Sequence, residues 1–458
     1  MLDTEPSLSK SLFSHIDFTN GAVAAVSGGS DSTALLLLLK THLDLTAPAT
    51  KLLAVTIDHG LRPGATAEAH AVASLCAERG IPHRILAWSG SKPSTGLPAA
   101  AREARYRLLA EAARAEGIGL ILTGHTADDQ AETVLMRRTR DGVGGDGARG
   151  LAGMAPATLY DWRCWIARPL LATRREALRD YLRRQHVGWA EDPTNEDATF
   201  ERPRVRAALV GDDDTARADS ALALSARAAA ERVELGQVAA GLIRDFASQP
   251  VTGLVRLDPG FLASGEDRAA IYALRILLAT IGGVAFLPEQ ARGEALFCRL
   301  KGGFLCATLS RTVVDFRRAG IFLHREARGL PSAAAMVDGA LWDGRRIITA
   351  SDSHGALLIA PLGAAAATAA AKRASQEGDA PASLARAALA LEPALWVDAE
   401  NQGLAADSPA SRMMAARPAV GPFARFLPSF DLALADAVAE LIGAAPVPPL
   451  PFSGQSAG

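Results

Sequence analysis

A run of small and hydroxyl-bearing residues near the amino terminus has the composition of a phosphate-binding turn. It connects the apolar segment 21–26 to the leucine-rich segment 33–40 and consists of Ser27, Gly28, Gly29, Ser30, Asp31 and Ser32. The glycines let backbone N–H groups approach a ligand, the serines add hydroxyl donors, and the positive end of the following helix faces the same point. Asp31 is placed to hold Mg²⁺ beside a polyphosphate. The stretch therefore predicts a cradle for phosphate or pyrophosphate.

This turn differs from the two commonest nucleotide-binding loops. It lacks the Gly-x-x-x-x-Gly-Lys pattern, since no lysine follows the glycines, and it lacks the Gly-x-Gly-x-x-Gly pattern of dinucleotide-binding folds. The plain alternative is a tight strand-to-helix connection in which serine and aspartate only cap the helix. We favour the phosphate cradle.

Further polar residues follow other apolar segments of the chain. Asp58 and His59 come directly after the segment 51–57, and His125 comes directly after the segment 119–124. The residues that follow strands of a parallel sheet are the ones that bind ligands. We expect His125 to position a nucleotide or to transfer a proton. An ordinary turn at 58–59 is the alternative for the first pair.

Two carboxylates close behind His125 are spaced for joint action. Asp129 and Glu132 stand three residues apart, so one turn of a helix presents both on the same side. Such a pair can bind a cation or accept a proton. The alternative is that Asp128 and Asp129 form an ordinary helix cap.

The apolar segments alternate with predicted helices at the spacing of βα units. Strands are expected at 21–26, 51–57, 82–88, 119–124 and 165–171, and helices at 33–40, 65–79, 97–116, 127–138 and 173–185. This alternation predicts an α/β fold with a Rossmann-like, doubly wound parallel sheet. The polar residues described above then share one edge of that sheet.

Composition and charge argue against several classes of protein. The formal net charge of the 458 residues is −2, so any nucleic acid contact must come from local patches. The four cysteines (Cys76, Cys164, Cys298 and Cys306) form no Cys-x-x-Cys pair, which argues against disulfides, a zinc ribbon and an iron–sulfur site. No apolar run is long enough for a membrane span, and the amino terminus lacks a signal sequence. We therefore expect a cytoplasmic protein with no membrane contact.

Taken together, the motifs over residues 20–206 resemble those of the tRNA(Ile)-lysidine synthetase family, which belongs to the PP-loop (N-type) ATP pyrophosphatases. The matching segments occur in the family's order and are 27–32, 58–62, 101–106, 123–133, 168–171 and 191–195. The segments Asp58-His-Gly-Leu-Arg and Asp128-Asp-Gln-Ala-Glu-Thr are the most specific of these. Pro203 stands where the family usually has asparagine, close to the expected tRNA contacts Arg204 and Arg206.

The resemblance implies a domain plan. It places a PP-loop ATP pyrophosphatase domain over 1–210, a mostly helical tRNA-binding middle domain over 211–330 and a small α/β carboxyl-terminal domain over 331–445. The Pro/Gly/Ser-rich stretch 446–458 is expected to be a disordered tail. The oligomeric state stays open, with a homodimer among the options.

The resemblance also implies an activity, that of an ATP-dependent carbon–nitrogen ligase. ATP, with Mg²⁺, adenylates the C2 carbonyl oxygen of the wobble cytidine in the CAU anticodon of tRNA(Ile) and releases pyrophosphate. The ε-amine of free L-lysine then attacks C2 and expels AMP, leaving lysidine. The anticodon then reads AUA instead of AUG.

Roles for individual residues follow from the same resemblance. The turn 27–32 together with Asp58 and His59 binds ATP, and Asp31 holds the metal. The expected catalytic residues are Asp31, Arg105, His125 and Asp129, and Asp129 and Glu132 bind lysine. The residues expected to contact tRNA are Arg102, Arg168, Arg204 and Arg206. A surface ion pair with Glu103 or Glu111 is the alternative for Arg105.

Three other functions compete with this interpretation. A tRNA cytidine thiolase of the same superfamily needs paired cysteines, and Cys76 and Cys164 are isolated. A small-molecule amidating ligase needs an ammonia source, for which the chain shows no motif. A catalytically inactive tRNA-binding module is the third, and the intact turn 27–32 argues against it.

Overall fold

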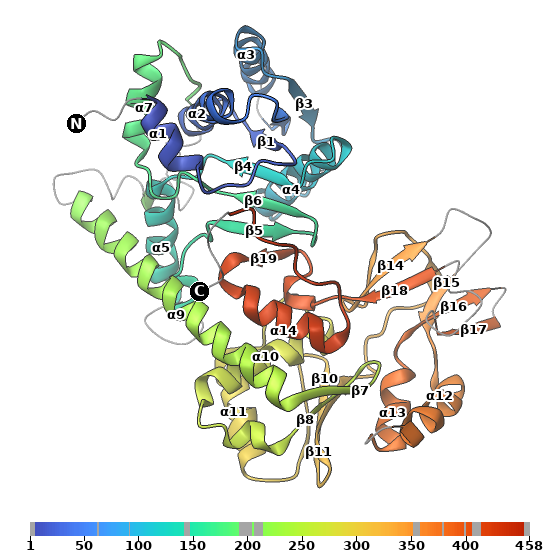
Figure 1. Ribbon diagram of the computed structural model, residues 1–458. Helices are drawn as coiled ribbons and strands as arrows, with labels where there is room; N and C mark the ends of the chain where they lie inside the picture. The colour runs from blue at the N-terminus through green and yellow to red at the C-terminus, as the bar shows by residue number, and fades with distance from the viewer. Residues whose placement is uncertain are drawn as a thin grey trace. The chain divides into compact units, whose positions relative to one another are not determined.

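The structure is a computed structural model that describes residues 5–61, 64–90, 92–141, 147–191, 204–205, 214–350, 358–377, 380–397, 400–404 and 414–452 (Figure 1). The chain divides into two compact units. The first comprises 1–231, 428–430 and 448–458, and the second comprises 232–427 and 431–447. The helix α9 (Asp214–Phe246) begins in the first unit and ends in the second.

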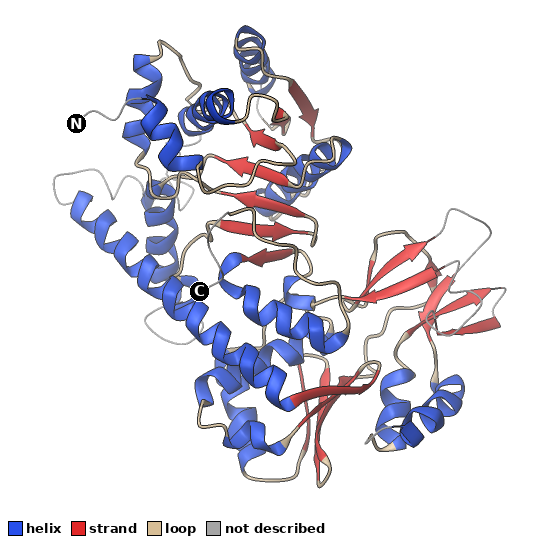
Figure 2. Ribbon diagram, in the orientation of Figure 1, coloured by secondary structure: helices blue, strands red, loops and turns tan. Residues whose placement is uncertain are grey.

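The first unit is built on a mostly parallel sheet with helices packed against it (Figure 2). Its strands are β1 (Ala22–Ala25), β2 (Leu52–Asp58), β3 (His83–Ala87), β4 (Leu120–Thr123), β5 (Ala157–Tyr160) and β6 (Cys164–Ala167). They lie side by side in the order β5-β6-β4-β1-β2-β3, and all neighbours except β5 and β6 run parallel. Its helices are α1 (Glu5–Phe13), α2 (Ser30–Thr46), α3 (Ala65–Glu78), α4 (Leu97–Ala115), α5 (Ala127–Asp141), α6 (Gly147–Gly150) and α7 (Arg175–Arg184). The predicted doubly wound α/β fold is confirmed.

The order of the strands creates a switch point beside β1. The chain runs from β1 to β2 and β3 in one direction, and α4 then carries it back past β1 to β4. Because such crossovers are right-handed, α2 and α3 cover one face of the sheet and α4 covers the other. The carboxyl ends of β1 and β4 therefore flank the point where the direction reverses, which is where doubly wound sheets bind ligands.

The middle of α2, residues 34–39, is apolar on every side because neighbouring elements cover it there, whereas Leu45 near its end is 62% exposed. The leucines at positions 35–39 are all buried, and the helix packs against α1, α7 and β1. An amphipathic pattern would have left one face for water. This packing fixes the start of α2, and with it the turn 27–32. No helix among the described residues is long and apolar enough to cross a membrane.

The prediction of the fifth strand was incomplete, because 157–167 forms a hairpin of β5 and β6. Its turn places Asp161 at φ 50° and Trp162 at φ 59°, and the N–H of Arg163 donates to the carbonyl of Tyr160 at 3.0 Å. Positive φ in a hairpin turn is usually signalled by glycine or asparagine. An Asp-Trp pair carries no such signal, and β5 was therefore not predicted.

The tail was predicted to be disordered from residue 446, and this is wrong for the described part of it. The carbonyl of Pro451 accepts the N–H of Asp17 at 2.9 Å, and Phe452 forms a bridge with Ile16. The ring of Phe452 also lies 5.6 Å from that of His15. Partners far away in the sequence order this proline-rich stretch, and local composition does not reveal them.

The described residues of the second unit form three sheets. Its strands are β7 (Ala247–Val251), β8 (Leu254–Leu257), β9 (Cys306–Leu309), β10 (Thr312–Arg317), β11 (Gly320–Arg325), β12 (Ala334–Ala335), β13 (Leu341–Trp342), β14 (Arg346–Ala350), β15 (Leu358–Pro361), β16 (Pro393–Val397), β17 (Glu400–Leu404) and β18 (Met414–Pro418). They form the sheets β7-β8-β11-β10-β9, β12-β15-β16-β17 and β13-β14-β18. Its helices after α9 are α10 (Asp267–Gly282), α11 (Gln290–Lys301), α12 (Ala364–Glu377), α13 (Ala382–Leu389) and α14 (Leu432–Ile442). The first of these sheets falls within the predicted middle domain, whose separation from a third domain stays a prediction.

The second unit contains a network of buried ion pairs. Glu392, whose side chain is 2% exposed, accepts from Arg345 Nη1 at 2.8 Å and from Arg346 Nε at 2.7 Å. Arg345 and the buried Arg325 also contact Asp343. Burial would raise the pKa of Glu392, but the two guanidinium groups beside it outweigh burial and hold that pKa below its usual value.

Replacing Glu392 with alanine should destabilise the second unit. Two buried guanidinium groups would lose their carboxylate, and breaking a buried pair in this way costs about 3–5 kcal/mol. Chemical denaturation of the full chain measures the change. Glu440→Ala is the matched control, because Glu440 pairs with Arg244 while 69% exposed, and it should cost under about 1 kcal/mol. Equal effects of the two substitutions would contradict this account.

Candidate active site

The turn 27–32 between β1 and α2 is closed by hydrogen bonds of its own. The Ser32 hydroxyl accepts the N–H of Ser27 at 3.1 Å and donates to the carbonyl of Gly29 at 3.2 Å. Gly28 has a φ of +88°, which glycine adopts without strain. Gly29 is the N-cap of α2 and offers no side-chain acceptor to the first N–H groups of that helix. Helices bind anions at such an end.

Gly124 brings the end of β4 against the start of α2. A Cβ atom at this position would lie 2.9 Å from backbone atoms of Asp31 and Ser32, which is too close for any other residue. The close approach places His125 and the first turn of α5 beside the turn 27–32. The residues that follow β1 and those that follow β4 therefore lie next to each other at the switch point.

Asp58 and His59 stand at the end of β2, next to β1 in the sheet. Asp58 accepts hydrogen bonds from the N–H of Gly60 and the hydroxyl of Thr66, both at 2.8 Å, and these bonds lower its pKa. Burial, and then the charge of Arg105, lower the pKa of His59 to about 4. The buried Nδ1 of His59 has no hydrogen-bond partner among the described residues. A neutral ring with an open nitrogen suits a contact with a bound nucleotide.

Three carboxylates from two elements meet at one guanidinium group. Arg175, the first residue of α7, contacts Asp31 through Nε at 3.0 Å, Asp129 through Nη2 at 3.1 Å and Glu132 through Nη1 at 3.6 Å. The four side chains are between 2% and 18% exposed. Asp31 comes from α2 and the other two acids from α5. The phosphate turn and the acidic pair are thus parts of one cluster.

Burial and the charge of Arg175 shift the pKa of Asp31 in opposite directions. Burial raises the pKa of Asp31, and Asp129 raises it further, while Arg175 lowers it. The pKa of Arg175 lies above its usual value because Asp129 and Asp31 outweigh the effect of burial. Further positive charge entering the cluster would favour ionised carboxylates.

His125 is neutral at physiological pH. Burial, and then the charge of Arg168, lower its pKa to about 3, and its Nδ1 lies 2.9 Å from the Thr123 hydroxyl. A ring with so low a pKa is a weak base. The structure therefore favours positioning of a ligand over proton transfer for His125.

The arginines predicted to bind tRNA, and the predicted catalytic residue Arg105, differ in exposure. Arg102, Arg105 and Arg204 are exposed, and the Arg102 guanidinium lies 4.9 Å from the ring centre of Tyr106. Arg168 is only 5% exposed and donates to the Ala155 carbonyl at 2.8 Å and the Thr158 hydroxyl at 3.0 Å. The prediction that Arg168 contacts tRNA does not fit this burial. Arg206 lies outside the described residues.

Residues of the segment 128–133 make hydrogen bonds that fix neighbouring elements, in addition to the contacts of Asp129 and Glu132 with Arg175. Asp128 accepts the N–H of Arg175 at 2.7 Å, which fixes the start of α7. Gln130 bonds to the backbone N–H and carbonyl of Met154 and to Ser225 of α9. Asp129 accepts the N–H and hydroxyl of Thr126, both at 2.9 Å, so it caps α5 as well as contacting Arg175. Asp129 therefore caps α5 with one carboxylate oxygen, as the plain alternative predicted, and contacts Arg175 with the other.

Among the described residues, no group of three or more acidic, histidine or cysteine side chains has the geometry of a ready-made metal site. Mg²⁺ in nucleotide enzymes often takes one or two carboxylates and completes its shell with phosphate oxygens and water. The carboxylate of Asp31 at the phosphate turn fits that requirement. The donor set is therefore suited to a metal that arrives with ATP.

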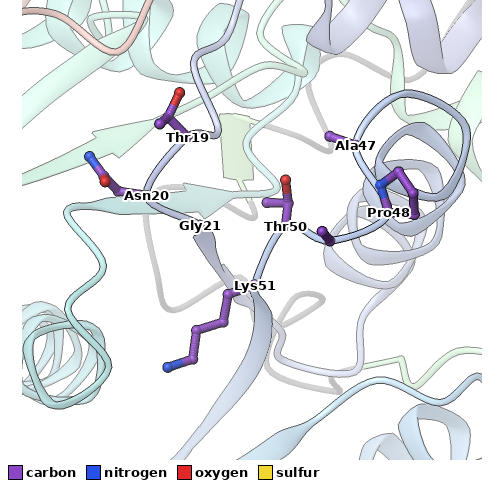
Figure 3. Close-up of a pocket in the computed structure, with 8 residues that line it drawn as sticks. Thr19, Asn20, Gly21, Ala47, Pro48, Thr50 and Lys51 are labelled. Carbon is purple, nitrogen blue, oxygen red and sulfur yellow. The ribbon is translucent and has the colours of Figure 1, made fainter.

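A hollow of about 470 Å³ lies at the opposite edge of the sheet (Figure 3). The residues that line it are Thr19, Asn20, Gly21, Ala47, Pro48, Ala49, Thr50 and Lys51. They precede β1 and β2, whereas the turn 27–32 follows β1. The hollow is therefore separate from the candidate site.

Comparison with known proteins identifies the family. The model of the PP-loop domain matches residues 6–212. A tRNA(Ile)-lysidine synthase of Mesorhizobium japonicum is 71% identical over the full length of both chains. The chain belongs to the tRNA(Ile)-lysidine synthase family. A Brucella ovis member is 40% identical over 331 residues, which cover 70% of this chain and 72% of that protein. A solved structure of the U34-tRNA thiolase NcsA from Methanococcus maripaludis covers 48% of this chain and 76% of its own, at 17% identity and a TM-score of 0.40.

Membership of this family confirms the resemblance inferred from the motifs. Sequence reasoning nevertheless missed Arg175, which stands at the centre of the acid cluster. The residue lies among Arg174, Arg179, Arg183 and Arg184, and composition does not tell which of these faces inwards. Its position directly after the strand β6 and its connecting turn was the available signal.

Replacing Gly124 with alanine should weaken ATP binding. The added Cβ would force the turn 27–32 and the start of α5 apart, and a displacement of this kind costs on the order of 10²-fold in activity. Binding of ATP to the purified variant measures the effect. Gly241→Ala is the control, since a Cβ there meets no described atom within 4 Å. Wild-type ATP affinity in Gly124→Ala would show that the close approach is not required.

Proposed function

We propose that the chain ligates L-lysine to C2 of the wobble cytidine in the CAU anticodon of tRNA(Ile), using ATP. The observation that carries the proposal is the cluster in which Asp31 of the phosphate turn and the acids Asp129 and Glu132 share one guanidinium group. A ligase of this kind needs a phosphate cradle and an amine pocket side by side. The full-length similarity to tRNA(Ile)-lysidine synthase supports the same substrates.

In the first step the C2 carbonyl oxygen of cytidine attacks the α-phosphate of ATP. The bond to the pyrophosphate breaks, and negative charge grows on that leaving group. Backbone N–H groups at the start of α2 and the hydroxyls of Ser27, Ser30 and Ser32 are positioned to stabilise this charge. Asp31 would hold Mg²⁺, which supplies further positive charge at the phosphates. Arg105 serves as a cation toward the α-phosphate, and Asp58 and His59 border the nucleotide.

In the second step the ε-amine of lysine attacks C2 and AMP leaves. Lysine is mostly an ammonium ion at neutral pH, so a pocket must bind the cation and a base must take its proton. Asp129 and Glu132, which share one helix turn, provide the carboxylates. His125 holds the adenylated intermediate in place and, with its low pKa, leaves the proton to the carboxylates.

We assign the contacts with tRNA to local basic residues rather than to the overall charge. Arg102 and Arg204 are exposed, and Arg206 belongs to the same stretch of sequence as Arg204. The segments 211–330 and 331–445 carry separate sheets and serve as two domains that grip the tRNA outside the anticodon. The protein acts in the cytoplasm, where its tRNA, ATP and lysine are found.

A tRNA thiolase is the nearest competing function, and the cysteines weigh against it. Cys76 and Cys164 are buried, and burial raises their pKa to about 11 and about 12. A thiol that carries sulfur needs the opposite, a low pKa and exposure. Cys298 and Cys306 are exposed but belong to the second unit, away from the sequence of the phosphate turn.

The direct test is AMP release from ATP by the purified protein, with and without L-lysine and unmodified tRNA(Ile) carrying the CAU anticodon. We expect AMP and lysine-labelled tRNA only when all components are present. Release of AMP with a sulfur donor or ammonia, and never with this tRNA, would move the function to a sister family.

Replacing Asp31 with alanine should abolish adenylation while the fold persists. Loss of a group that stabilises the leaving pyrophosphate costs about 10²–10³ in rate by analogy with oxyanion-hole donors. Pyrophosphate release reports the step, and thermal unfolding reports the fold. A variant with unchanged melting and normal pyrophosphate release would remove the turn 27–32 from the mechanism.

Replacing Asp129 with asparagine should impair the use of lysine more than the binding of ATP. The amide keeps an acceptor for Thr126 but loses the charge that pairs with a cation, which is worth roughly tenfold or more in affinity. Lysine KM is expected to rise, with ATP KM changed less than about twofold. A lysine KM and a turnover both at the wild-type value would contradict the assignment.

A further inference from the structure

Arg175 occupies the place where the proposed function puts the substrate ammonium group. Its Nη2 contacts Asp129 at 3.1 Å and its Nη1 contacts Glu132 at 3.6 Å, so both acids of the lysine pocket face a guanidinium group. Its Nε is engaged as well, by Asp31 at 3.0 Å. All three nitrogens of the side chain are therefore directed at carboxylates.

The backbone holds Arg175 in this position. Its N–H donates to Asp128 at 2.7 Å, and two residues earlier the carbonyl of Thr173 accepts the N–H of Ala127 at 2.9 Å. Both bonds tie the start of α7 to the first turn of α5, which also carries Asp129. The side chain is thus aimed at the pocket by the same helix that supplies the pocket's acids.

The chemistry of the two cations makes them competitors. A guanidinium group stays protonated at all physiological pH values, so Arg175 cannot release the acids by losing its charge. The ε-ammonium group of lysine carries the same charge on a flexible aliphatic stem and needs the same carboxylate oxygens. Two cations that share these oxygens would also repel each other in a pocket whose acids are between 2% and 18% exposed.

We propose that Arg175 is the resident cation of the lysine pocket, and that substrate lysine binds by displacing its guanidinium group from Asp129 and Glu132. The proposal rests on the proposed function, because it assumes that lysine is the substrate. In the absence of substrate the guanidinium group of Arg175 pairs with both acids and fills the place of the amine. Arg175 is thus a residue that sets affinity for the amine substrate, since lysine binds only to the fraction of molecules whose pocket is open.

The test is Arg175→Gln in the full chain, assayed by incorporation of labelled lysine into tRNA(Ile) at saturating ATP. The lysine KM should fall about tenfold, which corresponds to a wild-type pocket that is open about one tenth of the time. The ATP KM should change by less than about twofold. Arg183→Gln is the matched control, because Arg183 lies on the same helix and pairs with Glu176 and Asp180 at 52% exposure. Its lysine KM should equal that of the wild type.

A second measurement separates competition from a structural role. Guanidinium ion at low millimolar concentration should raise the lysine KM of Arg175→Gln back toward the wild-type value, and it should leave Arg183→Gln unaffected. If Arg175→Gln fails to fold, Arg175→Lys keeps the charge but offers one donor group to three acids. It should lower the lysine KM in the same direction and by a smaller factor.

The outcomes distinguish this proposal from the function on which it rests. An unchanged or raised lysine KM in Arg175→Gln and Arg175→Lys, with incorporation by the wild type, overturns the resident-cation proposal alone. Failure of the wild-type protein to incorporate lysine under any condition overturns both.

Discussion

The guanidinium group of Arg175 joins the elements that form the candidate site of the first unit. Arg175 links the start of α2 to α5 through three carboxylates that would otherwise repel one another in a partly buried space. The phosphate turn, the acidic pair and the start of α7 therefore meet at a single set of ion pairs. Gly124 makes this possible, because only a residue without a side chain allows the end of β4 to lie against α2.

Sequence was a good guide wherever one local rule decided the outcome. The segments at 51–57 and 119–124 form β2 and β4, as their largely apolar composition predicted, because strands covered on both faces consist mostly of apolar residues. The position of Asp31, His59 and His125 at one sheet edge followed from topology alone, since the carboxyl ends of parallel strands share that edge. The polar motifs were thus placed correctly before any side-chain geometry was known.

Sequence failed where a distant partner decided the outcome. Arg168 and Arg175 look alike in the sequence, yet one donates to Ala155 and Thr158 inside the protein and the other faces three acids. The turn at Asp161 takes a positive φ without glycine, and Phe452 is ordered by Ile16, more than four hundred positions away in the chain. Burial and long-range pairing carry no local signal of their own.

Each unit has a cluster of arginine–carboxylate ion pairs, but the ratio of cations to anions is reversed between the two clusters. In the second unit the buried Asp343 is contacted by the three guanidinium groups of Arg311, Arg325 and Arg345. In the first unit the three carboxylates converge on Arg175. Several cations around one acid already neutralise its charge, so such a cluster does not attract a further cation. Several acids around one cation form a cluster that favours positive charge, which is the property that the proposed binding of an amine requires.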